Sequence, residues 1–387
     1  MIGMSAVIFI PDDTAKTGYP QPLMLQSVMG APLLAWLANA LFDSGVGRFF
    51  LVCHDRYVEA ARACLPAEAE VMTTMDSDPA DLLHVFLSTA EDAEHTITVV
   101  TGPAVYLPQL APQAAGRFPR VYGVSREELM QALDEHFSFA RFLLDNGSPM
   151  NEEQAMYSVA SPAELPEIAG LLQRNRLLAL ARTGVEIYDA SSCYVEPSVR
   201  VAPGARLLPG TMLRGKTVIG EEAVIGPWSV IDDSVIGARA VVNASQVRES
   251  RVGQDAVVGP YASVRGGCEL GRSVRAGSFV ELKNARLGEN TQVPHLAYLG
   301  DTEAGANCNF GCGVATANFD RVQKHETAVG EGAFIGCNTA LIAPLQVGSG
   351  AYIGAGSTIT EDVPAQALGI ARARQSNKKE WAAKHKK

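Results

Sequence analysis

The sequence lacks the features that mark several common classes of protein. It has no apolar run long enough to span a bilayer, and its first ten residues lack the basic start and long apolar stretch of a secretory signal. The formal net charge of −10 argues against general binding to nucleic acid. We therefore expect neither a nucleic acid nor a membrane as a partner.

Cysteine is also scarce. The chain has seven cysteines, an odd number, and no two of them have the CxxC spacing of a zinc or redox motif. This usage favours a reduced, cytoplasmic protein without structural zinc, and we expect no metal cofactor. Cys308, Cys312 and Cys337 fall within the repeats described next, where a small buried thiol can fit.

Aliphatic side chains recur at every sixth position between residues 201 and 360. A six-residue period matches neither an α-helix nor an ordinary alternating strand, and it is typical of a parallel β-helix. Each hexapeptide forms one short strand and one corner of a three-sided prism, so the region predicts roughly nine coils. The three unbroken series are Val201, Leu207, Leu213, Ile219, Ile225, Ile231; Val252, Val258, Val264, Leu270, Ala276, Leu282; and Val329, Ile335, Leu341, Val347, Ile353, Ile359.

Two further parts of the chain have different patterns. Residues 317–327 break the six-residue spacing, which predicts a loop that projects from the prism. The first hundred residues alternate between strand-like and helix-like segments, which predicts a parallel sheet of the α/β class. The predicted strands are 2–10, 48–53 and 96–101, and the predicted helices are 32–44, 57–64, 82–90, 126–144 and 163–183.

The predicted elements divide the chain into four segments. They are an α/β domain over 1–160, a linker with a helix over 161–190, an all-β parallel β-helix over 191–370, and a basic tail over 371–387.

The densest cluster of polar candidates lies among the repeats. Its three cations, in an acidic protein, indicate an anionic ligand such as phosphate, although solvated surface residues remain the alternative. His295, the one histidine of the repeats proper, could accept a proton from an amine near neutral pH, or be a structural histidine. The members are Arg265, Lys283, His295, Tyr298, Asn309, Asn318 and Lys324.

From residue 193 onward the sequence resembles a known enzyme family. Residues 278–320 contain the stretches SFVELKNARLG, HLAYLGD and NCNFGCGVATANFD, in the order typical of bacterial bifunctional glucosamine-1-phosphate N-acetyltransferase / N-acetylglucosamine-1-phosphate uridylyltransferases. The similarity continues through GCNTALIAPLQVGSGAYIGAGSTIT and ALGIARARQ. It implies a left-handed β-helix, acetyl-CoA as co-substrate, an amino-sugar phosphate as substrate and a homotrimer with active sites between subunits.

The resemblance also implies roles for individual residues. His295 matches the general base that takes a proton from the 2-amino group of glucosamine. Arg265 and Lys283 match cations that hold the sugar phosphate, and Tyr298, Asn309 and Lys324 match further sugar and phosphate contacts. Asn318 matches a residue that supports the substrate and the acetyl group. Contacts to acetyl-CoA are implied for Asn318, Phe319, Cys337, Ala355 and Arg372, with the basic tail covering the coenzyme A end.

The chain departs from the family pattern at several positions. The family's Arg-Pro-Gly reads Arg265-Gly266-Gly267, its Tyr reads Phe319, and its acetyl-CoA-contacting Ser reads Cys337, a weaker hydrogen-bonding group. These differences leave three functions open: acetylation of glucosamine 1-phosphate, acylation of another amino sugar that could be nucleotide-linked, or a non-catalytic trimeric scaffold that binds sugar phosphates.

Residues 1–110 resemble a degenerate, shortened version of the family's uridylyltransferase half. The glycine-rich phosphate loop after the first strand is missing, and Leu23 follows Pro22 where the family has Lys. Gly30-Ala31-Pro32 replaces the family's GKP, and Gly102-Pro103 stands where its metal-binding Asp belongs. Without cations or metal to neutralise a triphosphate, we expect this nucleotidyltransferase-like domain to be inactive as a uridylyltransferase.

Overall fold

The structure is a computed structural model that describes residues 4–74, 79–90, 95–110, 120–134, 139–150 and 155–385. Residues 2–3 of the first predicted strand and 135–138 of the predicted helix 126–144 lie outside these ranges, as do Lys386 and Lys387 of the basic tail. The chain divides into two compact units, residues 1–183 with 194–199, and residues 184–193 with 200–387. Within the described ranges, no helix is both long and apolar enough to cross a membrane.

Unit 1 is an α/β domain, as the sequence predicts. Its main sheet has the order β5-β4-β1-β6-β8-β9, in which β5, β4, β1 and β6 run parallel and β8 and β9 are antiparallel additions. The strands are β1 (Ser5–Ile10), β4 (Arg48–Cys53), β5 (Glu70–Thr74), β6 (Thr96–Val100), β8 (Val121–Ser125) and β9 (Ser148–Met150). Two small antiparallel pairs join β2 (Ser27–Val28) to β3 (Ala31–Pro32) and β7 (Ala104–Tyr106) to β10 (Met156–Ser158).

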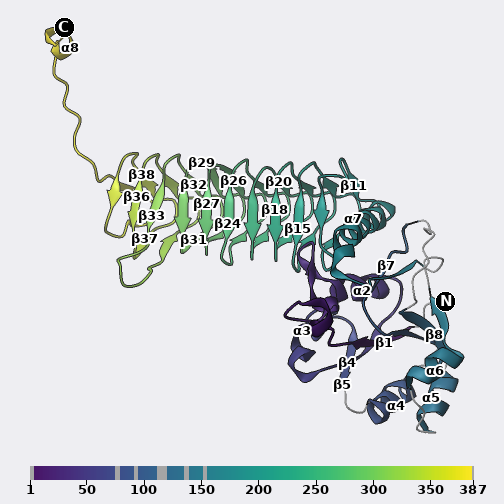
Figure 1. The fold of residues 1–387 in the computed structure, drawn as a ribbon. Helices are drawn as coiled ribbons and strands as arrows, with labels where there is room; N and C mark the ends of the chain where they lie inside the picture. The colour runs from purple at the N-terminus through teal and green to yellow at the C-terminus, as the bar shows by residue number, and fades with distance from the viewer. Residues whose placement is uncertain are drawn as a thin grey trace. The chain divides into compact units, whose positions relative to one another are not determined.

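Helices cover both faces of this sheet (Figure 1). One core joins Ala6 and Ile8 of β1 to α2 (Leu33–Phe42), α3 (Val58–Arg62) and α7 (Leu165–Arg182). The other core joins Val7 of β1 to α4 (Ala80–Ser88), α5 (Arg126–Asp134) and α6 (Phe139–Asn146). Successive side chains of β1 thus point into two different hydrophobic layers, as in a sheet that is buried on both faces. The short helix α1 (Thr14–Thr17) and the 3₁₀ turns Leu23–Leu25, Asp55–Tyr57 and Pro162–Glu164 lie in the connections.

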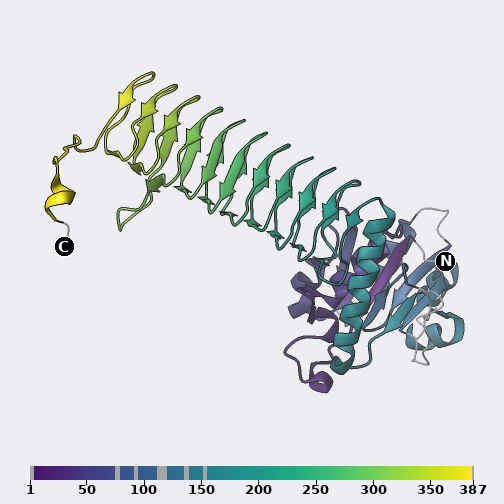
Figure 2. The same ribbon diagram turned by 90° about the horizontal axis from the view of Figure 1, so that it is seen from above.

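Unit 2 is a parallel β-helix, which confirms the fold predicted from the six-residue period. Short strands stack in register into three sheets, consistent with the left-handed form (Figures 1 and 2). We name the sheets by their strand numbers within residues 184–385, all of which the structure describes: the eleven-strand, ten-strand and nine-strand faces. A short final helix, α8 (Trp381–Lys384), lies in the exposed tail.

The eleven-strand face contains β11 (Glu186–Ile187), β14 (Arg206–Leu207), β17 (Val224–Ile225), β20 (Val241–Val242), β23 (Val257–Val258), β26 (Arg275–Ser278), β29 (Gln292–His295), β32 (Asn309–Phe310), β35 (Phe334–Ile335), β38 (Tyr352–Ile353) and β40 (Leu368–Gly369). The ten-strand face contains β12 (Tyr194–Val195), β15 (Met212–Arg214), β18 (Val230–Asp232), β21 (Gln246–Arg248), β24 (Ser263–Arg265), β27 (Glu281–Lys283), β30 (Tyr298–Gly300), β33 (Ala315–Ala317), β36 (Ala340–Ile342) and β39 (Thr358–Ile359). The nine-strand face contains β13 (Arg200–Val201), β16 (Val218–Ile219), β19 (Val235–Ile236), β22 (Arg251–Val252), β25 (Glu269–Leu270), β28 (Arg286–Leu287), β31 (Thr302–Ala304), β34 (Thr327–Val329) and β37 (Leu345–Val347).

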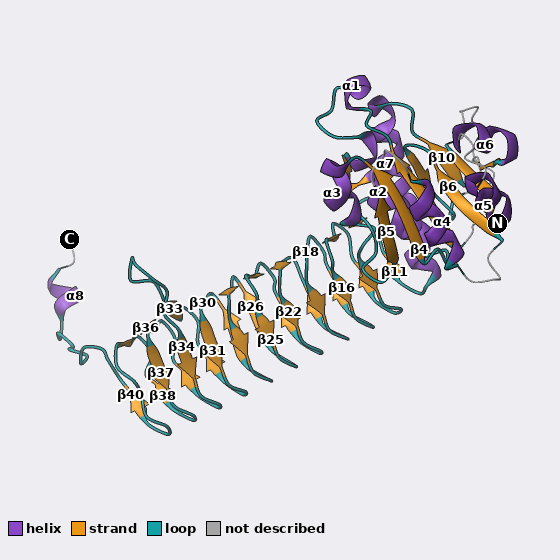
Figure 3. Ribbon diagram, turned by 90° about the horizontal axis from the view of Figure 1, so that it is seen from below, coloured by secondary structure: helices purple, strands orange, loops and turns teal. Residues whose placement is uncertain are grey.

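The aliphatic residues of the repeats fill the prism. Leu213, Val264 and Leu282 are fully buried, as are most members of the three series. The series are separate in the sequence because some coils use a five-residue step, as from Ile231 to Ile236 and from Leu282 to Leu287, both buried pairs. The segment between β33 and β34 leaves the prism as a projecting loop, as predicted for residues 317–327 (Figure 3).

Candidate functional site

Two of the predicted phosphate-binding cations stand in one column on the ten-strand face. Arg265 ends β24 and Lys283 ends β27, and the two are register partners on neighbouring strands. The next residue in this column is Gly300, which ends β30. Since alternate side chains of a strand point to opposite sides, buried Val264 and Leu282 leave Arg265 and Lys283 directed outward.

The projecting loop brings a third cation to this column. The pKa of Lys283 is held below its usual value, first by contact with the Lys324 side chain and then by burial, with the charges of Lys324 and Arg265 adding to the effect. Asp301 opposes the shift, because its carboxylate favours the charged amine. The structure therefore brings Arg265, Lys283 and Lys324 together. Glu281 pairs with Arg265 and Asp301 lies 3.9 Å from Lys283, so these two carboxylates offset only part of the charge of the three cations.

Asp320 fixes the loop that carries Lys324. Its carboxylate accepts the backbone N–H groups of Val322 and Gln323, each at 2.7 Å, and lies 2.8 Å from Nε2 of His325. These hydrogen bonds hold the pKa of Asp320 far below its usual value. A bridge between Phe319 and Lys324 closes the loop at its base.

A buried carboxylate, Asp301, lies behind the cations. It accepts hydrogen bonds from the side-chain amides of Asn284, at 2.7 Å, and Asn318, and its Oδ1 lies 3.9 Å from Nζ of Lys283. Asp301 and Asn284 were not among the residues selected from the sequence. Their positions in the sequence could have indicated them, since Asp301 is the last residue of the HLAYLGD stretch and Asn284 directly follows Lys283.

The side chains of Tyr298 and Asn318 both pack over Gly300. A Cβ atom at Gly300 would lie 2.4 Å from the Tyr298 hydroxyl and 2.7 Å from Nδ2 of Asn318, closer than real contacts allow. Glycine at this position therefore leaves room for both side chains beside the cation column. Asn318 is 6% exposed, and its side-chain oxygen accepts no hydrogen bond from the residues that the structure describes.

His295 lies at the neighbouring corner of the prism, not in the cation column. It ends β29 on the eleven-strand face, three residues before Tyr298, which begins β30 of the ten-strand face. Its side chain is exposed, and no hydrogen bond or ion pair joins it to the cations within the described residues. Asn309 lies farther from this corner, at the start of β32, opposite Gln292.

Three residues predicted to contact acetyl-CoA extend along the corner that holds His295. Backbone hydrogen bonds stack this corner coil by coil, from Gly313 N–H to Leu296 O at 2.7 Å, and from Gly356 N–H to Cys337 O at 2.8 Å. Cys337 and Ala355 are exposed corner residues, and a Cβ at Gly356 would contact the Arg372 side chain at 3.7 Å. Phe319 is instead exposed at the base of the loop.

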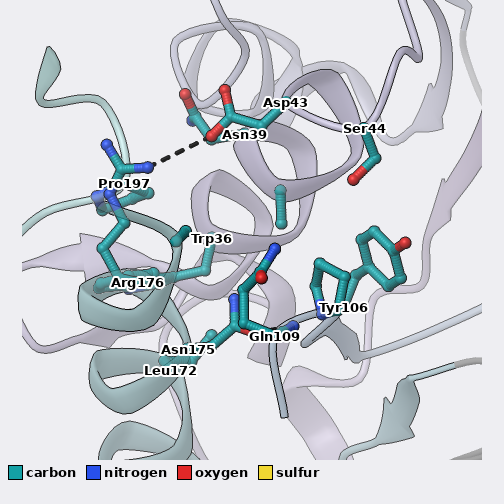
Figure 4. A pocket seen from close by; sticks show the side chains of 13 residues that line it. Trp36, Asn39, Asp43, Ser44, Tyr106, Gln109, Leu172, Asn175, Arg176 and Pro197 are labelled. Atoms are coloured by element: carbon teal, nitrogen blue, oxygen red, sulfur yellow. Dashed lines mark hydrogen bonds and ion pairs between the residues drawn. The ribbon is translucent and has the colours of Figure 1, made fainter. Parts of the chain in front are cut away.

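A separate small pocket lies within unit 1 and contains none of the predicted site residues (Figure 4). It is bordered by Trp36 and Asn39 of α2, Asn175 and Arg176 of α7, and the ion pair from Arg176 to Asp43 at 3.3 Å. In the described part of the chain, no group of three or more His, Cys, Asp or Glu side chains is placed to hold a metal ion.

Comparison with known proteins finds curated relatives for the larger part of the chain. The bifunctional protein GlmU of Brevibacillus brevis is 44% identical over 221 residues, which cover 57% of this chain and 48% of that protein. The protein of the same name from Clostridium perfringens is 41% identical over 240 residues, 62% of this chain and 53% of that protein. The chain thus spans about half the length of the curated relatives that it matches. No protein-family model matches it.

Two solved structures give weaker likenesses. The UDP-N-acetylglucosamine acyltransferase of Francisella novicida is 19% identical, with 48% of this chain and 66% of that chain covered and a TM-score of 0.26. The inositol-1-phosphate CTP transferase from T. maritima is 12% identical, with 46% and 97% covered and a TM-score of 0.35. Scores this low carry no argument. The sequence matches are stronger: over about 60% of its length, the chain is similar to proteins named bifunctional protein GlmU.

Proposed function

We propose that this chain is an N-acetyltransferase that moves the acetyl group of acetyl-CoA to the amine of glucosamine 1-phosphate. The observation that carries the proposal is the outward cation group of Arg265, Lys283 and Lys324 on the ten-strand face, with His295 at the corner that precedes β30 of the same face. A phosphate dianion would relieve the repulsion among these cations, and charge-assisted hydrogen bonds would hold it. The amino-sugar ring would then lie against Tyr298 and Asn318.

The acetyl donor would lie along the corner of Cys337 and Ala355, with Arg372 near the coenzyme A phosphates. With the phosphates near Arg372, the other end of acetyl-CoA, which carries the thioester, would lie towards His295 along the same corner. The imidazole of His295 takes a proton from the 2-amino group, and the nitrogen lone pair attacks the thioester carbonyl carbon. The carbon–sulfur bond then breaks, and coenzyme A leaves as a thiolate that takes up a proton.

The assembly and the N-terminal domain belong to the same proposal. We expect a homotrimer with active sites between subunits, as the family resemblance implies, and the exposure of the predicted base His295 in the single chain is compatible with this. We also expect no uridylyltransferase activity. The segment after β1 contains Asp12, which accepts hydrogen bonds from Thr14 and Arg56, in place of a glycine-rich loop that could approach a triphosphate.

One observation favours the second candidate, acylation of a different amino sugar. Gly266 and Gly267 both have positive φ angles, +69° and +81°. Proline fixes φ near −65°, so the turn after Arg265 cannot have the backbone of an Arg-Pro-Gly sequence. The changed turn borders a cation expected to hold the sugar phosphate, where it could alter sugar preference.

Release of free coenzyme A thiol tests the function. The chain should release thiol with acetyl-CoA and glucosamine 1-phosphate, with or without UTP, and should not convert UTP. His295→Ala should lower the rate by about 10²–10⁴, the usual contribution of a general base, without changing the sedimentation of the assembly. His54→Ala, a histidine of unit 1, is the matched control.

Each other outcome has a meaning. Thiol release with a different amino sugar alone would support the second candidate. Binding of glucosamine 1-phosphate without thiol release for any amino sugar would support a non-catalytic scaffold. Unchanged turnover in His295→Ala would exclude this residue as the base.

A further inference from the structure

The carboxylate of Asp301 contacts two side-chain amides at once. Its Oδ1 accepts from Nδ2 of Asn284 at 2.7 Å, and its Oδ2 accepts from Nδ2 of Asn318. Asp301 is 8% exposed and Asn318 is 6% exposed, so both groups are more than nine-tenths buried. Within the described residues, the Asn318 side chain makes no other hydrogen bond.

Asp301 is ionised at neutral pH. Burial alone would raise the pKa of its carboxyl, but the hydrogen bonds from Asn284 and Asn318 and the charges of Lys283 and Lys324 outweigh burial and lower the pKa. An ionised carboxylate has only acceptor atoms. Each amide that meets it must therefore turn its nitrogen towards Asp301 and its oxygen away.

We propose that Asp301 is a positioning residue of the acetyl-transfer site, which fixes the polarity of the Asn318 amide so that its carbonyl oxygen faces the amino group of the sugar. This inference rests on the proposed function. The partners of Asp301 support it: Lys283, 3.9 Å away, belongs to the cation group, and the Asn318 amide packs with Tyr298 over Gly300, the next residue of the cation column. One carboxylate thus links the predicted phosphate-binding and amine-binding parts of the site.

The polarity of Asn318 matters for an amine substrate. Before transfer, the 2-amino group has N–H bonds to donate, and an acceptor that binds one of them turns the nitrogen lone pair in a defined direction. An outward-facing amide nitrogen would place a donor against a donor. The acceptor must also be held before the substrate arrives, and a buried hydrogen bond to a charged group is strong enough to do this.

Exchange of the two side chains tests this role. Asp301→Asn has nearly the same shape, but one oxygen and one nitrogen cannot both accept from two amides, so one partner must turn over. We expect a roughly 10- to 100-fold fall in kcat, the scale of a lost hydrogen bond to a charged group, with a much smaller change in KM for glucosamine 1-phosphate.

In the double variant D301N/N318D, the new Asn donates to the new Asp, and an acceptor oxygen again faces the substrate. It should recover at least tenfold over the weaker single variant, as for coupled residues in a double-mutant cycle.

The matched control is Asp255→Asn. Asp255 is also a corner residue with positive φ, 58° against 48° for Asp301, and its carboxylate accepts from Arg239 at 2.8 Å. It lies between β22 of the nine-strand face and β23 of the eleven-strand face, a different corner from the one after β30 that holds Asp301, so its loss should change kcat by less than about twofold.

A second readout does not need acetyl transfer. Calorimetry gives the preference for glucosamine 1-phosphate over glucose 1-phosphate, in which a hydroxyl that can donate or accept replaces the amine. The wild type should prefer the amine, Asp301→Asn should lose most of this preference, and the double variant should regain it.

The outcomes separate the two proposals. Thiol release by the wild type with unchanged kcat and sugar preference in Asp301→Asn would overturn the role of Asp301 and leave the proposed function intact. Absence of thiol release with the expected shifts in sugar preference would overturn acetyl transfer and leave the polarity of Asn318 supported. A wild type that binds neither sugar phosphate would overturn both.

Discussion

Arg265 and Lys283 are register partners on neighbouring strands, so two cations face one another on the ten-strand face. Like charges in this position oppose pairing of the strands. Each has a carboxylate nearby, Glu281 for Arg265 and Asp301 for Lys283, yet Lys324 adds a third positive charge. Repulsion among these cations is unfavourable in the protein without ligand, and a bound anion would relieve it.

The first prediction concerns pH. The pKa of Lys283 lies below its usual 10.5, because Lys324 and burial disfavour the charged amine. A bound phosphate favours the charged form, so the affinity for glucosamine 1-phosphate should fall as pH rises through the lowered pKa, before it reaches 10.5. Lys283→Arg keeps its charge in this range and should retain affinity at high pH.

Calorimetry at a series of pH values checks this, with Lys216→Arg as a control, since Lys216 is an exposed lysine of unit 2 away from the predicted site. Parallel loss of affinity in the wild type and in Lys283→Arg would contradict the assignment of Lys283 to the phosphate.

The second prediction concerns thiol reactivity. Of the seven cysteines, all described, Cys337 is exposed, while burial raises the pKa of Cys64 to about 12. A thiolate is the reactive form, so an alkylating reagent at pH 8 should modify Cys337 before the buried cysteines. If acetyl-CoA binds along this corner, it should slow the modification at least about tenfold at saturation.

Mass spectrometry of the alkylated peptides measures both rates, and Cys337→Ser should remove the fast phase. Equal modification of Cys337 with and without acetyl-CoA would place the acetyl donor elsewhere.

The prism was predictable because its physical requirement repeats. Each hexapeptide needs one inward aliphatic side chain, such as Leu213, Val264 or Ile335. The resulting spacing can be read from the local sequence alone, without knowledge of contacts between distant residues. The five-residue steps, such as Leu282 to Leu287, divide the pattern into series, since a shorter corner shifts the spacing without changing the inward position.

The site was only partly predictable. The cations were visible as residue types, but their meeting depends on the register of β24 with β27 and on a loop that returns Lys324 to the column. Asp301 was missed because an acidic residue in a sequence does not reveal burial or partners. Its role appears only when Asn284 and Asn318, from adjacent coils, donate to the same carboxylate. In unit 1 the antiparallel strands β8 and β9 depend likewise on pairing that local sequence does not specify.

The last prediction concerns the loop that carries Lys324. Asp320 accepts the N–H groups of Val322 and Gln323 and contacts His325, so it closes the turn from within. Because these partners lower its pKa far below 3.8, their contribution to loop stability is fully present above that pH and is lost progressively as pH falls from there through the much lower folded-state pKa. The loop should therefore keep its structure in mild acid.

Asp320→Ala should open the loop at neutral pH and expose it to trypsin, which cleaves after Arg321 and Lys324, both exposed residues. We expect cleavage there to accelerate roughly tenfold, because lost hydrogen bonds raise the population of the open form. The KM for glucosamine 1-phosphate should rise with it, since Lys324 would no longer be held beside Lys283. Asp320→Asn retains an oxygen that can accept both N–H groups, so it should resemble the wild type in cleavage rate. If Asp320→Ala is cleaved no faster than Asp320→Asn, the backbone bridge between Phe319 and Lys324 holds the loop without Asp320.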